Sequence, residues 1–163
     1  MSLQEHKVVT YCSGRVRFSV LPRYYNDIKC GAKTVEGRPY YKCYHAIDVD
    51  DIVEIVNSVS KETFLARIVT KQVFSGFREM LKGKTVKACL PGHEDATLDE
   101  AVQVYHSFMD GDYERLAARY GVVSFCLQVV DKAACTAGIK LTYTLSLCSL
   151  AHIISMVHGG VPM

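Results

Sequence analysis

Several patterns that mark metal centres, disulfide frameworks and secretion are missing from this sequence. Its seven cysteines include no C-x-x-C pair and show no regular spacing, and its six histidines form no H-x-H or H-x-x-x-H pair. We therefore expect reduced, mostly buried thiols, and neither a metal nor another cofactor. The polar start, residues 1–7, lacks the features of a signal peptide. These absences together predict an intracellular protein of the cytoplasm or the nucleus.

A strong net charge and internal repeats are missing as well. The formal net charge of +2 over 163 residues does not by itself predict nucleic-acid binding. The charge is nevertheless uneven: residues 7–44 hold eight Lys or Arg against two acids, residues 67–87 hold six against one, and residues 94–114 hold seven acids and no Lys or Arg. A basic face that attracts phosphate is one interpretation. An ordinary solvated surface is the other, and the charge counts alone favour it.

One domain followed by a tail is the most economical organisation for a chain of this length. We expect the domain to span residues 1–131 and the tail to span residues 132–163, and we expect a monomer. Residues 141–157 are apolar or hydroxylated apart from His152. This stretch is shorter than the ~20 apolar residues that a membrane helix needs. A helix packed on the domain, or a disordered apolar extension, is therefore favoured over a membrane anchor.

Short alternating segments and turn signals predict strands threaded with helices. The clearest helix signal is Thr97-Leu98-Asp99-Glu100, in which the threonine and the glutamate three residues later match a capping box. Because the pattern shows no regular βαβ alternation, it predicts an α+β fold with a curled sheet or barrel. The predicted strands are residues 7–11, 15–21, 34–38, 52–56, 64–73 and 122–130, with residues 40–44 as a loop or short strand. The predicted helices are residues 23–30, 75–81, 97–108 and 112–120.

A cluster of charged residues follows the first predicted helix. Gly31 can supply the left-handed conformation that ends a helix. If a strand begins at Thr34, its two-residue period places Glu36 and Arg38 on the same face, with Lys33 in the turn above them. Three charges this close form either a structural ion-pair cluster or a polar pocket. We favour a pocket, because buried charge is costly and gathers at functional sites.

The order of these elements and motifs resembles the ASCH domain family, a relative of the PUA domain. The resemblance runs from about residue 8 to residue 130. It implies a PUA-like small β-barrel flanked by helices, and an RNA-binding or nucleobase-binding module whose pocket is built on the charged motif. The matching segments are Lys33-Thr34-Val35-Glu36-Gly37-Arg38, Val49-Asp50-Asp51-Ile52, residues 75–81, Leu90-Pro91-Gly92, residues 97–108 and Tyr120-Gly121-Val122-Val123.

One branch of this family consists of small amidohydrolases that deacetylate N4-acetylcytidine, so the resemblance implies such a hydrolase as the alternative function. Lys33 and Arg38 match the Lys-Thr-x-Thr-x-Arg motif of that branch, and Glu94 falls at its later glutamate. Glu36 replaces the threonine that is the branch's proposed nucleophile. In a hydrolase, Lys33 would stabilise the oxyanion and Glu94 would act as an acid or base. Glu36 or Thr34 would then stand in for the nucleophile.

Basic residues alternate with tyrosines in residues 15–44, a composition that favours phosphate contacts together with base stacking. For any single tyrosine, a place in the core or on a wet surface is the favoured alternative. The residues expected to bind the substrate are Arg38, Tyr40, Arg23 and Tyr25. The residues expected to contact RNA are Arg15, Arg17, Lys29 and Lys42. The expected partner is accordingly an RNA or a nucleoside ligand.

Overall fold

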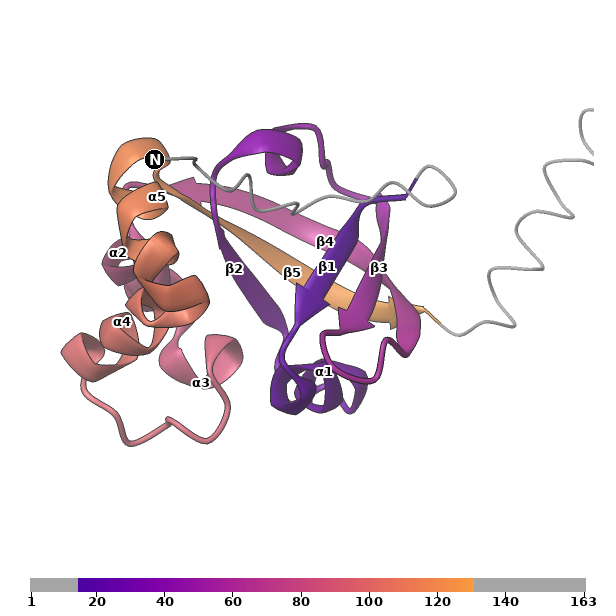
Figure 1. Ribbon diagram of the computed structural model, residues 1–163, viewed down its shortest axis with the longest axis horizontal. Coiled ribbons are helices and arrows are strands. Elements are labelled where there is room, and N and C mark those ends of the chain that lie inside the picture. Colours follow the sequence, from indigo (N-terminus) through magenta and orange to yellow (C-terminus); the bar gives the residue numbers. More distant parts are fainter. Residues whose placement is uncertain (1–14, 131–163) are drawn as a thin grey trace, which may run out of the picture. The chain divides into compact units, whose positions relative to one another are not determined.

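The computed structural model describes residues 15–130, which form one five-stranded sheet with helices packed against it (Figure 1). The strand order is β1-β3-β4-β5-β2, so the two strands that come first in the sequence form the edges. β1 pairs with β3 in parallel, whereas β3 with β4 and β2 with β5 are antiparallel. The strands are β1 (Arg17–Val20), β2 (Val35–Pro39), β3 (Ile52–Asn57), β4 (Thr63–Phe74) and β5 (Val122–Val130).

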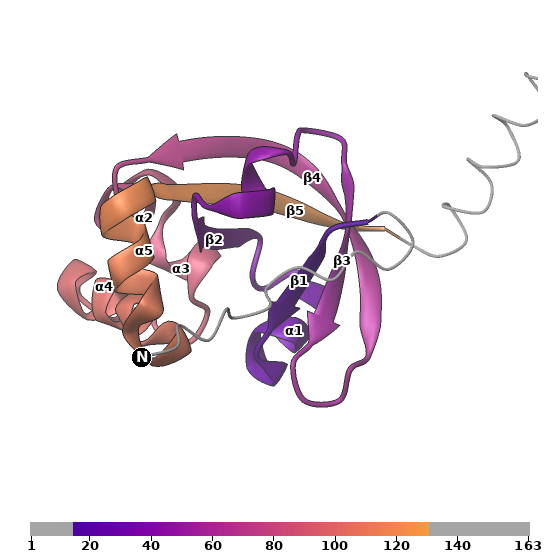
Figure 2. The ribbon, with the colours of Figure 1, turned by 45° about the horizontal axis from the view of Figure 1, so that its top comes forward.

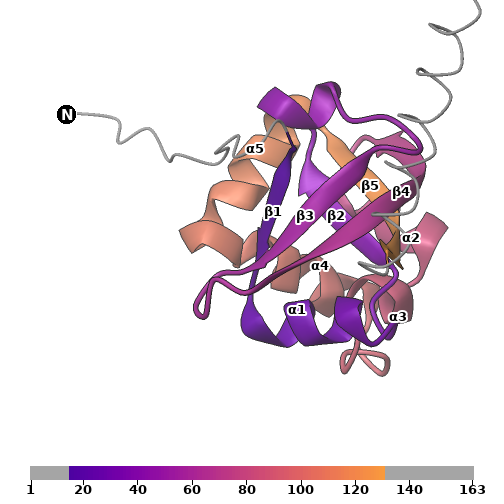
Figure 3. The same ribbon diagram turned by 90° about the vertical axis from the view of Figure 1, so that its right-hand side faces the viewer.

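The sheet is curled, as the crossing strands in Figure 3 show. Its curl brings the two edge strands within reach of one side chain, since Arg38 on β2 donates a hydrogen bond to the carbonyl oxygen of Ser19 on β1 at 2.8 Å. The long strand β4 and strand β5 lie side by side; β4 runs toward α2, and β5 leads away from α5 (Figure 2). The result is an open half-barrel whose two edges face each other across Arg38.

Helices cover the sheet in two places. In Figure 1, α2, α4 and α5 lie together at the left, whereas α1 follows β1 at the bottom of the view. Pro22 occupies the first turn of α1, where its missing N–H costs no hydrogen bond. The helices are α1 (Pro22–Lys29), α2 (Phe77–Lys84), α3 (Val86–Cys89), α4 (Leu98–His106) and α5 (Asp112–Tyr120), and the short 3-10 turns are η1 (Lys42–His45) and η2 (Phe108–Gly111).

Aromatic contacts join strands within the sheet and helices within the helical layer. Phe18 on β1 lies against Phe125 on β5, with ring centroids 5.4 Å apart. On the helical side, the rings of Phe77 and Tyr105 stack at 4.3 Å, which joins α2 to α4. Both contacts involve fully buried side chains, so each adds geometric specificity to a large buried apolar area.

The predicted α+β fold with a curled sheet and flanking helices is confirmed, and so is the capping box at Thr97. Of the loop or short strand predicted for residues 40–44, the structure has a loop, in which the 3-10 turn η1 begins at Lys42. One predicted element is corrected. The helix from Thr97 ends at His106 and does not reach Phe108, because Met109 and Asp110 take left-handed φ values of 52° and 54°.

Other expectations fall on residues that the structure does not describe. The strand predicted for residues 7–11, the boundary after residue 131 and the apolar segment 141–157 all lie outside the described residues. Between residues 15 and 130, every helix is too short or too polar to cross a membrane.

Candidate functional site

Three charged side chains with almost no solvent exposure form the centre of the site. Lys33, Glu36 and Arg38 are 3%, 6% and 5% exposed. The Glu36 carboxylate accepts a hydrogen bond from Nε of Arg38 at 2.7 Å and lies 3.3 Å from Nζ of Lys33. The predicted cluster is confirmed as a buried triad of two cations and one anion. Its net positive charge distinguishes it from a neutral ion pair.

The local chain path explains how the triad forms. After α1, Gly31 adopts a φ of +82°, and the turn is fixed by a hydrogen bond from the Lys33 amide to the Asp27 carbonyl at 2.9 Å. β2 then pairs with β5, so that Glu36 lies opposite Phe125 and Arg38 opposite Val123. The two-residue period of the strand places both charged side chains on one face.

All three N–H donors of the Lys33 ammonium are used within the protein. It donates to the carbonyl oxygens of Val35, at 2.7 Å, and of Cys89, and it forms the ion pair with Glu36. An ammonium has three N–H donors, so these three partners account for all of them. Lys33 therefore ties β2 to the end of α3 and holds Glu36 in place, and it has no donor left for a ligand.

Arg38, by contrast, retains hydrogen-bonding capacity. Of the five N–H donors of its guanidinium, one is used by Glu36 and one by Ser19. The hydroxyls of Tyr44 and Tyr113 lie close enough to raise its pKa. Since Arg38 also lines the cavity described below, its remaining donors are available to these hydroxyls and to a ligand.

The charges of the triad stabilise one another. Burial acts to raise the pKa of Glu36, but Arg38 and Lys33 outweigh this effect and hold the pKa below its ordinary value of 4.5. The pKa of Arg38 is raised well above its ordinary value; burial opposes this, and the nearby Tyr113, Tyr44 and Glu36 oxygens cause it. Glu36 is therefore a carboxylate at neutral pH and an acceptor of hydrogen bonds.

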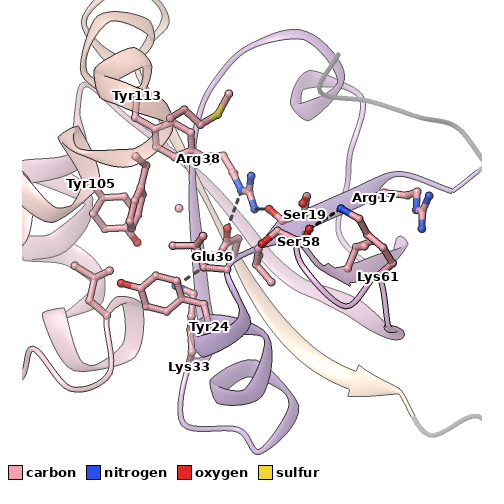
Figure 4. Close-up of a pocket in the computed structure, with 17 residues that line it drawn as sticks. Arg17, Ser19, Tyr24, Lys33, Glu36, Arg38, Ser58, Lys61, Tyr105 and Tyr113 are labelled. Carbon is pink, nitrogen blue, oxygen red and sulfur yellow. Dashed lines mark hydrogen bonds and ion pairs between the residues drawn. The ribbon is translucent and has the colours of Figure 1, made fainter. Parts of the chain in front are cut away.

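A cavity of about 720 Å³ opens beside the triad (Figure 4). Its polar side is formed by Glu36 and Arg38, and its aromatic side by Tyr24, Tyr105 and Tyr113. Burial raises the pKa of each of these tyrosines, so their hydroxyls stay protonated at neutral pH. The volume lies within the range of small-molecule sites, and the aromatic wall with a few converging polar groups is typical of them.

Gly37 allows the helical wall to approach the triad closely. A Cβ atom at this position would lie 2.7 Å from both Sδ and Cε of Met80 and 3.0 Å from the Tyr105 hydroxyl. Because the contacts with Met80 are shorter than real Cβ atoms show, a side chain here would displace the end of Met80 and crowd Tyr105. The glycine between Glu36 and Arg38 thus sets the position of α2 and α4 over the site.

Two residues predicted as catalytic are placed away from the cavity. Thr34 is exposed and precedes the first residue of β2, so it does not share the buried face of Glu36, and the predicted nucleophile role finds no support in its position. Glu94 is exposed too, and its carboxylate accepts a hydrogen bond from the Gly92 amide at 2.9 Å, which lowers its pKa. Neither residue lines the cavity.

The residues predicted to bind the substrate are also divided. Arg38 lines the cavity, but the others do not. Arg23 donates a hydrogen bond to the Pro91 carbonyl, Tyr25 is buried in the core against Phe64, and Tyr40 stacks on His45. Tyr25 is therefore a core residue, which is one of the positions favoured above for a single tyrosine.

Among the four residues predicted to contact RNA, Arg17 is a cavity residue, and it pairs with Glu54 at 2.5 Å. Arg15 is half-buried before β1 and does not line the cavity. Lys29 and Lys42 are exposed, and each lies over a tyrosine ring, Lys29 over Tyr25 and Lys42 over Tyr41. These four basic residues therefore do not converge on one point.

Several cavity residues were not predicted from the sequence. Tyr24 and Tyr105 follow the apolar periodicity of their helices, which assigns them to the core, and Tyr113 lies in the first turn of α5 without a distinctive motif. Lys61 and Ser19 also line the cavity. A tyrosine at an inward-facing helical position, where phenylalanine would suffice for packing, is the one signal that points to a polar cavity.

The described residues offer no metal site: no group of three or more His, Cys, Asp or Glu side chains between residues 15 and 130 is placed to hold an ion. The polar groups of the cavity are hydroxyls, one carboxylate and basic side chains. They suit an organic or anionic ligand.

Comparison with known proteins supports the fold. No protein-family model matches the chain, and no curated protein matches it. The chain is similar to the crystal structure of hypothetical protein PH0355, with 28% identity over 70% of this chain and 97% of the other and a TM-score of 0.60. It is also similar to the solution structure of protein PF0455 from Pyrococcus furiosus, with 26% identity over 71% and 96% and a TM-score of 0.55.

A crystal structure of ASCH from Zymomonas mobilis matches as well, with 14% identity over 69% of this chain and 65% of the other and a TM-score of 0.46. An ASCH domain structure is thus among the structural neighbours. The function of the cavity has to be argued from its own residues.

Proposed function

We propose that the chain is a nucleobase-binding module of the RNA-binding type, and that its cavity holds the base. The single observation that carries this proposal is a buried triad with unsatisfied hydrogen-bonding capacity at the edge of a cavity with a tyrosine wall. Aromatic rings stack on nucleobases irrespective of their identity, whereas converging polar groups select among them. A buried charged cluster that only braced the fold would not need an adjoining cavity.

The polar side of the cavity favours particular bases. Each carboxylate oxygen of Glu36 has one protein partner and can accept a further hydrogen bond. Exocyclic amino groups, such as N4 of cytosine, are natural donors to a carboxylate. The remaining donors of Arg38 can reach a ring nitrogen or carbonyl oxygen beside that amino group. The proposal therefore favours cytosine and adenine over uracil.

Calorimetric titration of the full chain with cytidine, adenosine and uridine tests this proposal. We expect cytidine and adenosine to bind at least about tenfold more tightly than uridine, since one good base-edge contact contributes 1–3 kcal/mol. Equal affinity for the three nucleosides would contradict the role of Glu36. No binding of any of them would overturn the proposed function.

A variant that fills the cavity tests the proposal without changing any of the three triad residues. Ser19 lines the cavity from an exposed position on β1, so Ser19→Trp should block it without removing a core side chain. Thr70→Trp is the matched control, because Thr70 is exposed on β4 and does not line the cavity. We expect Ser19→Trp to lose nucleoside binding and Thr70→Trp to retain it, with both variants folded by circular dichroism.

Hydrolysis of N4-acetylcytidine is the second candidate function. It is favoured by one observation, the position of an ionised Glu36 carboxylate in the cavity lining, because a carboxylate can act as a general base on water. In this proposal Glu36 would be the base and Arg38 would stabilise the oxyanion, since the donors of Lys33 are occupied and Thr34 and Glu94 lie away from the cavity. Release of cytidine and acetate by the full chain, lost in Glu36→Gln, would support it. Binding without turnover would exclude it.

A further inference from the structure

The mouth of the cavity carries a second group of polar residues that the base-binding proposal does not use. Arg17, Ser19, Ser58 and Lys61 line the cavity from β1 and from the turn that joins β3 to β4. Figure 4 shows Lys61, Ser58 and Arg17 on one side of Arg38, and Tyr24, Tyr105 and Tyr113 on the other. The cavity is thus divided into an aromatic half and a basic, hydroxyl-bearing half.

The turn between β3 and β4 is built to hold Lys61 at this mouth. The buried side chain of Asn57 accepts hydrogen bonds from the amides of Val59, at 3.0 Å, and Ser60, at 3.1 Å. The Lys61 amide donates to the Asn57 carbonyl at 3.0 Å. Lys61 adopts a φ of +64°, in the left-handed region that favours glycine. Its ammonium donates to the Ser58 carbonyl at 2.5 Å, which directs the side chain along the cavity edge.

The charge balance of the cavity is strongly positive. Among the described residues that line it, Arg17, Lys33, Arg38 and Lys61 are basic and Glu36 is the acidic residue. Arg17 is compensated by Glu54, but Lys61 forms no ion pair with any residue between 15 and 130. The buried triad carries a further uncompensated positive charge, which solvent screens poorly. Such a cavity favours an anion, and basic side chains beside hydroxyl groups are suited to phosphate.

We propose that the ligand of this cavity is a 5′-phosphorylated nucleotide, whose phosphate binds at Lys61, Arg17 and Ser58 while its base lies against the tyrosines. This inference rests on the proposed function, because it assigns the phosphate end of the same ligand. The phosphate belongs either to a free nucleoside monophosphate or to the 5′ end of an RNA strand. Both sources present the same dianion to the mouth of the cavity.

Calorimetric titration of the full chain with cytidine and cytidine 5′-monophosphate tests the inference. We expect the monophosphate to bind at least about tenfold more tightly, which corresponds to 1.4 kcal/mol. Lys61→Ala should remove most of this preference by weakening binding of the monophosphate far more than binding of cytidine, and Lys61→Arg should restore it. Lys82→Ala is the matched control, because Lys82 is an exposed lysine on α2 that does not line the cavity.

Each outcome has a distinct meaning. Cytidine binding without a preference for the monophosphate would overturn the inference and leave the proposed function standing. Absence of binding by both probes would overturn both. Equal losses in Lys61→Ala and Lys82→Ala would show general electrostatic attraction and would also overturn the inference. If the preference holds, a 5′-phosphorylated RNA trinucleotide that binds as tightly as the monophosphate identifies the RNA end as the source, and one that does not identifies the free nucleotide.

Discussion

At the scale of single residues, the triad shows why a buried charge is informative. Removing two cations and a carboxylate from water is costly, and their mutual attraction compensates only when the geometry is good. Here Glu36 satisfies both cations at once, whereas the backbone carbonyls of Val35, Cys89 and Ser19 accept the nearby donors. Substitution of any one of the three side chains therefore leaves the desolvation cost of the remaining buried charges partly uncompensated.

Glu36→Gln should destabilise the protein strongly, because it leaves Lys33 and Arg38 buried without an anion. We expect a loss of about 3–5 kcal/mol in the free energy of unfolding, measured by urea denaturation. Glu54→Gln is the control: it breaks the Arg17 ion pair, in which both side chains are more accessible to water, and should cost about 1 kcal/mol or less. Similar losses in the two variants would contradict a special role for the triad.

The same carboxylate should make stability depend on pH. The pKa of Glu36 in the folded state is below its ordinary value of 4.5, with burial opposing the shift and Arg38 and Lys33 causing it. Its contribution is therefore fully present above about pH 4.5 and is lost as the pH falls through the folded pKa. We expect the stability difference between the wild type and Glu36→Gln to shrink as urea titrations move below about pH 4.5. A difference that stays constant would show that Glu36 does not titrate with folding.

At the scale of elements, the beginning of α4 determines how firmly part of the cavity wall is held. Oγ1 of Thr97 accepts the Glu100 amide at 3.3 Å, and Oε2 of Glu100 accepts the Thr97 amide at 2.7 Å. This helix carries Tyr105 into the cavity. A capping box of this kind satisfies two amides that the first turn of a helix otherwise leaves free.

Thr97→Ala should therefore destabilise the fold moderately. We expect a loss of about 0.5–2 kcal/mol in the free energy of unfolding, measured by urea denaturation. Gln103→Ala is the matched control, because Gln103 is exposed on the same helix and alanine has at least as high a helix propensity. An equal effect of the two substitutions would show that the cap contributes nothing beyond propensity.

At the scale of the whole molecule, local signals predicted most elements but not the composition of the cavity. The capping box at Thr97, the glycine after α1 and the alternation in β4 depend on neighbouring residues, so sequence periodicity was sufficient for them. The triad was predicted for the same reason, since its members lie within six residues. The end of α4 was missed because the left-handed residues Met109 and Asp110 carry no glycine signal.

The cavity wall, by contrast, depends on tertiary packing. Tyr105 and Tyr113 belong to separate helices, and their convergence on Glu36 follows from how α4 and α5 pack. Lys61 is brought to the cavity by the register of β3 with β4. Thr34 shows that periodicity alone can also place a residue wrongly. The strand begins at Val35, one residue later than predicted, and Thr34 is exposed.

The distribution of charge over the molecule bears on RNA binding beyond the cavity. Lys29 and Lys42 are exposed basic residues outside the cavity, so they test whether an RNA backbone extends from it. If each contacts one phosphate, Lys29→Ala and Lys42→Ala should each reduce the slope of log K against log salt concentration by about 0.7 for single-stranded RNA. Fluorescence anisotropy with a short RNA, repeated over a range of salt concentrations, measures this slope. Lys82→Ala should leave the slope unchanged. If Lys29→Ala and Lys42→Ala also leave it unchanged, the RNA backbone does not pass over these residues, and contact is confined to the cavity.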